Sequence, residues 1–80
     1  MTVKSNDESV KLSTKVREYY VIVYEKDGER KITIEDFWYN SPLPWIIEYL
    51  EKTYGKNKRH GPFYQENWAV QKAMELEEGK

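Results

Sequence analysis

The chain lacks cysteine altogether and has a single histidine among its 80 residues. Disulfide bridges and thiolate metal sites are therefore excluded, and histidine clusters that bind zinc cannot form. The carboxylates do not have the spacing of a calcium-binding loop, and the four glycines do not form a phosphate-binding loop. The sequence thus predicts no metal, no cofactor and no small-molecule substrate.

Long apolar runs are also missing. A helix that crosses a membrane needs roughly 18 or more consecutive apolar residues, and no stretch of this sequence approaches that length. The N-terminal stretch "MTVKSNDESVKLSTK" is polar and has no apolar centre of the kind found in secretory signals. We therefore expect a cytoplasmic protein without a membrane partner.

An excess of charge of one sign is absent as well, because 13 basic and 14 acidic residues give a net charge of −1. This balance predicts no strong general attraction to polyanions. Aromatic residues make up 15% of the chain, which argues against a disordered polypeptide. We expect a flexible N-terminus over residues 1–8 and one compact domain over residues 9–80.

The clearest structural pattern is "REYYVIVYEKDGERKITIED". It contains two β-rich runs joined by Asp27-Gly28, a pair that favours a two-residue type I′ turn. This turn sets Val21 opposite Ile34 and gives one apolar face and one mixed face. The mixed face carries Tyr20, Ile22, Tyr24, Lys31, Thr33 and Glu35. Alternating apolar residues over 9–16 predict a further strand.

Two helices are predicted after the hairpin. Ser41 and Pro42 favour a helix start, and Gly55 favours an end after Tyr54. The expected core stripe of this helix is Leu43, Ile46, Ile47, Leu50 and Tyr54, and that of a second helix over about 62–78 is Phe63, Val70, Ala73 and Met74. The predicted fold class is α+β: a small antiparallel sheet of two to three strands, followed by two helices packed on its apolar face.

Several large side chains have no place in this predicted core. They are Tyr20, Ile22 and Tyr24 on the outer sheet face, Trp45 and Tyr49 on the back of the first helix, and Tyr64 and Trp68 on the flank of the second. Tyrosine and tryptophan are favoured where proteins bind one another, because each brings a large rigid surface with a polar tip. These seven residues are the predicted partner-binding set.

A second candidate site is the basic stretch "GKNKRHGPFY". Lys56, Lys58, Arg59 and His60 could neutralise phosphates or contact an acidic surface while neighbouring aromatics stack on bases. The alternative interpretation is a solvated connection between the two helices. Catalysis is a third hypothesis, for instance a small ribonuclease toxin using Arg59, His60 and a glutamate, but no catalytic group is singled out.

The sequence therefore predicts a non-enzymatic protein-interaction module, with a nucleic-acid-binding protein as the alternative. The partner is either a different protein or a second copy, since a sheet edge could pair about a two-fold axis. Small, cysteine-free and acidic α+β chains without catalytic groups are typical of accessory proteins of phages and mobile elements. Such a protein would act as an inhibitor of a host or defence protein in the host cell cytoplasm.

Overall fold

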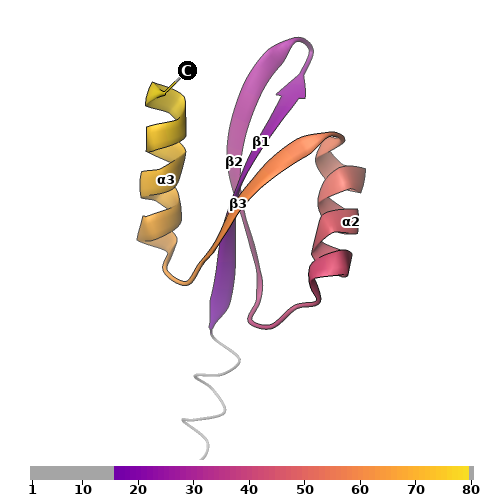
Figure 1. Cartoon of the computed structure of the whole chain (residues 1–80), viewed down its shortest axis with the longest axis vertical. Helices are drawn as coiled ribbons and strands as arrows, with labels where there is room; N and C mark the ends of the chain where they lie inside the picture. Colours follow the sequence, from indigo (N-terminus) through magenta and orange to yellow (C-terminus); the bar gives the residue numbers. More distant parts are fainter. Residues whose placement is uncertain (1–15, 80) are drawn as a thin grey trace, which may run out of the picture.

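The computed structural model describes residues 16–79 (Figure 1). The elements in chain order are β1 (Arg17–Lys26), β2 (Glu29–Trp38), α2 (Leu43–Tyr54), β3 (Asn57–Phe63) and α3 (Glu66–Glu78). The predicted flexible segment 1–8 and the strand predicted over 9–16, except its last residue, lie outside the described residues. The α+β class is confirmed, with three antiparallel strands and two helices in the part of the chain that the structure describes.

The hairpin has the predicted turn and register. Asp27 and Gly28 have φ angles of 56° and 78°, as a type I′ turn requires. Val21 lies opposite Ile34 and Val23 lies opposite Ile32. The turn residues and the alternation of apolar side chains favour the same register, so the strand pairing could be predicted from the sequence.

The third strand is formed by the basic stretch, so the alternative interpretation of this stretch as only a solvated connection between two helices is wrong. β3 pairs antiparallel with β1, and the sheet order is β2-β1-β3. Lys58, Arg59 and Gly61 are poor strand formers, but β1 offers a full row of backbone partners on its free side. The register shifts between Tyr19 and Val21, close to Pro62, where a missing N–H is tolerated.

The two helices lie on opposite faces of the sheet, which differs from the expected placement on one face (Figure 1). α2 packs on the face that carries Tyr20 and Ile22. On the other face, which carries Val21, the Arg30 guanidinium donates a hydrogen bond to the backbone oxygen of Leu76 in α3. The reason is β3, which runs between the helices along β1 and carries the chain from one face to the other.

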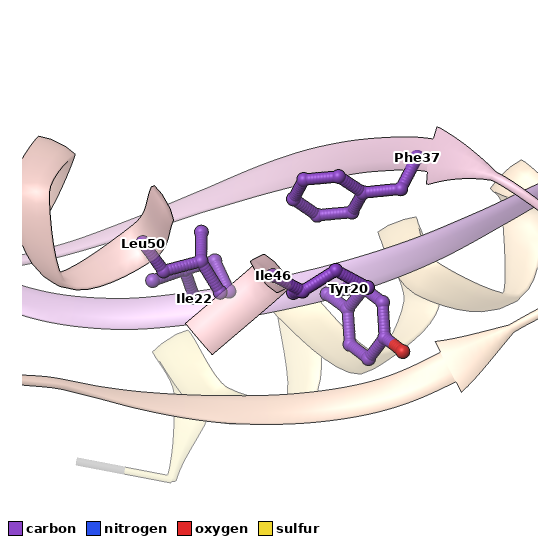
Figure 2. Close-up of a cluster of buried hydrophobic side chains, with 5 residues drawn as sticks. All are labelled: Tyr20, Ile22, Phe37, Ile46 and Leu50. Carbon is purple, nitrogen blue, oxygen red and sulfur yellow. The ribbon is translucent and has the colours of Figure 1, made fainter. Parts of the chain in front are cut away.

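Figure 2 shows the main core on the α2 face. It consists of Tyr20, Ile22, Phe37, Ile46 and Leu50, all buried. Ile46 and Leu50 belong to the predicted stripe of α2, whereas Leu43 at the start of that stripe is exposed. The spacing of four residues places both buried side chains on the face turned to the sheet.

The stripe predicted for the second helix is wrong in phase. α3 begins at Glu66 rather than at 62 or 63. It buries Ala69 completely and turns Val70 and Met74 toward solvent. Phe63 belongs to β3 instead of the helix. Small apolar residues on the sheet side of α3 gave too weak a periodic pattern to fix the rotation of the helix from sequence.

Candidate functional site

Two of the predicted partner-binding residues lie in the core instead of on the surface. Tyr20 and Ile22 are covered by α2, with exposed fractions of 3% and 0%. Tyr24 is half-buried, and its ring lies 4.6 Å from that of Tyr54. The mixed face of the hairpin is therefore covered by a helix, because β1 is the central strand and must bury both of its faces.

The two predicted binding residues of α2, Trp45 and Tyr49, are exposed, but their rings are held in place by packing. Trp45 and Tyr49 stack with ring centroids 5.8 Å apart and an interplanar angle of 15°. Both rings also meet the buried Phe37 edge-on, at 5.8 and 5.7 Å. Trp45 nevertheless leaves 52% of its surface exposed. One face of this pair is thus fixed by packing while the other remains available.

Two further aromatic residues, which the sequence reasoning missed, are also exposed. Trp38, the last residue of β2, is 57% exposed, and the Arg17 guanidinium carbon lies 4.1 Å from its ring centroid. Tyr39 follows it and lies 6.3 Å from Tyr64, ring to ring. The sequence did contain a signal for their exposure, because "FWYN" stands at the end of a predicted strand, where the alternation of buried and exposed residues stops.

We call the exposed set the aromatic end: Trp38, Tyr39, Trp45, Tyr49, Tyr64 and Trp68. It lies at the end of the sheet away from the Asp27-Gly28 turn, where β2 and β3 end and where α2 and α3 begin (Figure 1). The stretches 37–47 and 61–65 that supply most of it contain no charged residue, although 34% of the chain is charged. Aromatic enrichment with depletion of charge is typical of the core of a protein interface.

The basic residues predicted to act together do not share one face. Lys58 and His60 lie opposite Val23 and Val21, so they project on the α3 side of β3. Arg59 lies opposite Ile22 and projects on the α2 side, 5.9 Å from the Tyr20 ring. Strand alternation thus divides the basic stretch between two faces.

A broad hollow of about 800 Å³ lies toward the hairpin turn, away from the aromatic end. Its lining includes Tyr24, Tyr54, Arg30, Lys56 and Lys58. These three cations take part in none of the ion pairs found in the described part of the chain. The Tyr54 hydroxyl donates to Glu35, and burial together with this hydrogen bond raises the pKa of Tyr54. Glu25 also lines the hollow, which therefore combines aromatic walls with an excess of positive charge.

His60 is the only histidine of the chain and is half-buried. Burial lowers its pKa, and the nearby Lys72 and Lys58 add to the effect. Such surroundings favour the neutral imidazole. Among residues 16–79 no group of three or more His, Asp or Glu side chains could hold a metal ion. No helix within that range is long and apolar enough to cross a membrane.

The lowered pKa of His60 predicts a loss of stability in mild acid. The unfolded chain takes up a proton near the ordinary histidine pKa of about 6.5, while the folded chain does so only at lower pH. Stability is therefore full above pH 6.5 and declines as the pH falls through the folded pKa. Urea unfolding followed by circular dichroism between about pH 5 and 7 measures this slope. His60→Gln should flatten it, and an unchanged slope would contradict the prediction.

Neither a family model nor a curated protein nor a solved structure matches this chain. Four of the seven predicted partner-binding residues belong to the aromatic end, together with Trp38 and Tyr39.

Proposed function

We propose that this chain is a non-enzymatic interaction module that binds a protein partner through the aromatic end. The single observation that carries the proposal is the set of six exposed aromatic side chains at one end of the sheet, four of them on two uncharged stretches. A small domain seldom exposes so many large aromatic side chains near one another without using them. Tryptophan and tyrosine are also the residues that most often dominate binding energies.

The arrangement of Trp45 and Tyr49 adds support. Because both rings already pack on Phe37 and on each other, binding would immobilise few additional rotamers. Such preorganisation favours affinity in an aromatic surface. The partner surface is expected to be largely apolar with hydrogen-bond acceptors for indole and phenol groups. We further propose that the partner is a host or defence protein in the cytoplasm whose action is inhibited by binding; size, lack of cysteine and lack of catalytic groups motivate this step.

The test compares a variant of the aromatic end with a matched surface control. Trp38→Ser combined with Tyr64→Ser removes two exposed rings that do not pack on Phe37. Glu48→Ser combined with Lys52→Ser changes two exposed residues of α2 that form only a surface ion pair. A protein captured from cells by the wild type and the control, but not by the aromatic variant, is then purified and titrated. The aromatic variant should bind it about tenfold or more weakly.

The proposal is wrong if every captured protein binds the aromatic variant and the wild type equally. The control variant guards against a general effect of two surface substitutions, since it must retain full affinity. Both variants should keep cooperative thermal unfolding, because the replaced side chains lie outside the core.

Nucleic-acid binding is the second candidate, favoured by the cations and tyrosines around the hollow beside β1. Labelled single- and double-stranded oligonucleotides are titrated at low and moderate salt. If about three phosphates are neutralised, log affinity should fall against log salt with a slope of about −2 to −3. The variant Arg30→Ala, Lys56→Ala and Lys58→Ala, which removes the cations of the hollow, should abolish that binding, while absence of binding at low salt would remove this candidate.

A further inference from the structure

β2 is an edge strand whose outer side has no partner strand within residues 16–79. Burial shows the difference between the edge and the centre. Val21 in the central strand is completely buried, whereas Ile34 directly opposite it in β2 is only half-buried. Ile32 is also half-buried. A row of free backbone donors and acceptors along ten residues is a ready template for another strand.

The order of residues along β2 is complementary to itself. Its first half carries Arg30 and Lys31, its second half carries Glu35 and Asp36, and Ile32, Thr33 and Ile34 lie between them. When two such strands run antiparallel, the basic half of each meets the acidic half of the other. This property belongs to the edge alone and does not depend on the aromatic end.

Backbone geometry restricts the possible registers. Along a strand the outward-pointing hydrogen-bonding groups alternate, and opposed residues of an antiparallel pair are in the same bonding state. When β2 pairs with its own copy, two opposed residues must therefore both be odd-numbered or both be even-numbered. Centring the pair on Thr33 sets Lys31 opposite Glu35 and Arg30 opposite Asp36.

The other registers near the middle of the strand are worse. Centring on Ile32 opposes Glu29 and Glu35, and centring on Ile34 sets Ile32 against Asp36. Centring on Lys31 or on Glu35 puts like charges face to face at the axis, which is destabilising. Only the Thr33 register matches opposite charges and also sets Ile32 against Ile34.

We propose that two copies of the chain associate through β2 about a two-fold axis at Thr33, forming one continuous six-stranded sheet. Backbone hydrogen bonds and the coverage of Ile32 and Ile34 supply most of the affinity, while the charges select the register. The contacts of these side chains within each chain are compatible with this arrangement: Lys31, 3.1 Å from Glu29, has three donors, and Glu35, which accepts from the Tyr54 hydroxyl, has further acceptor sites. The Asp36 carboxylate, 2.8 Å from Arg17, can accept from a second guanidinium, and Arg30 uses one of its five donors on Leu76.

The first test is the mass in solution, measured by light scattering and sedimentation over a range of concentrations. The wild type should be dimeric. Lys31→Glu alone and Glu35→Lys alone should each weaken the dimer by about tenfold or more. Residue 31 of each copy faces residue 35 of the other, so either substitution creates two like-charge pairs, one on each side of the axis. An equimolar mixture of the two variants restores both opposite-charge pairs and should recover the dimer.

The second test uses the absence of native cysteine. In the proposed register Thr33 faces Thr33 of the second copy, with Cα atoms about 4.5 to 5.5 Å apart, which is within the range for a disulfide. Thr33→Cys should form a covalent dimer under mild oxidation. Lys52→Cys, on the exposed side of α2, is the matched control. At the same concentration it should form no covalent dimer and should run as a monomer on a denaturing gel without reducing agent.

A monomeric wild type at all concentrations would overturn the proposal. A dimer that survives both single charge variants unchanged, or that cross-links no better at Thr33 than at Lys52, would overturn it too. Because these tests alter Lys31, Thr33 and Glu35, none of which belongs to the aromatic end, their failure leaves the proposed partner surface unaffected, and the reverse also holds.

Discussion

Ile22→Ala is expected to lower the free energy of unfolding by about 2–5 kcal/mol, the range for a large-to-small change at a buried site. Ile22 is completely buried and lies in the cluster that joins β1 to α2. Because small domains have total stabilities of about 5–15 kcal/mol, such a loss would remove a large share. Urea unfolding followed by far-ultraviolet circular dichroism measures it.

Ile47→Ala is the matched control, since it makes the same chemical change at a half-buried position of α2. It should cost less than Ile22→Ala, because part of the removed surface is already in water. If the two losses were equal, or if Ile22→Ala left stability unchanged, α2 would not cover the Tyr20 and Ile22 face. The mixed face of the hairpin would then be exposed to solvent, as the sequence predicted.

Gly61→Ala is expected to cost about 2–5 kcal/mol, through backbone strain combined with overpacking. Gly61 has φ of +131°, outside the range that L side chains readily adopt. An added Cβ would lie 2.8 Å from the backbone oxygen of Tyr19 and 3.0 Å from Cδ1 of Tyr20. One of these neighbours belongs to the backbone of the central strand and cannot give way without disturbing the sheet.

Gly28→Ala separates the two contributions. Gly28 also has a positive φ, of +78°, but an added Cβ would meet nothing within 4 Å. Its cost should be limited to about 1–2 kcal/mol of backbone strain. If both substitutions lowered the free energy of unfolding equally in the same urea titration, β3 would not approach β1 closely at Gly61.

Gly61 also bears on the proposed function. It lies in the part of β3 that leads to Phe63 and Tyr64, so a displaced strand would move one side of the aromatic end. The contact with the Tyr20 side chain links this strand to the main core. A glycine that lets two strands approach closely thus helps to hold the proposed binding surface in position.

The parts of the fold that the sequence predicted are the local ones. Asp27-Gly28 specifies its turn through two positive φ angles, and the alternation around it specifies the register. The first helix is bounded by Pro42 and Gly55, and its buried residues recur at helical spacing. Each of these signals is contained in a short segment, so no knowledge of distant residues is needed.

The parts that could not be predicted depend on distant contacts. β3 forms because β1 offers it backbone partners, although its own residues favour a loop. Once β3 is added, β1 becomes central, and Tyr20 and Ile22 change from surface candidates to core residues. Trp38 was overlooked for a related reason, since exposure at a strand end depends on where the covering helices stop.

The placement of the tryptophans has a practical consequence for optical measurements. All three, Trp38, Trp45 and Trp68, are exposed at the aromatic end, and none lies in the core. Because each indole keeps only about half of its surface in water, native emission should change less on unfolding than the emission of a core tryptophan would. Covering the aromatic end, by contrast, should shift the emission to shorter wavelength and protect it from acrylamide. In this protein, intrinsic fluorescence reports occupancy of a surface rather than integrity of the fold.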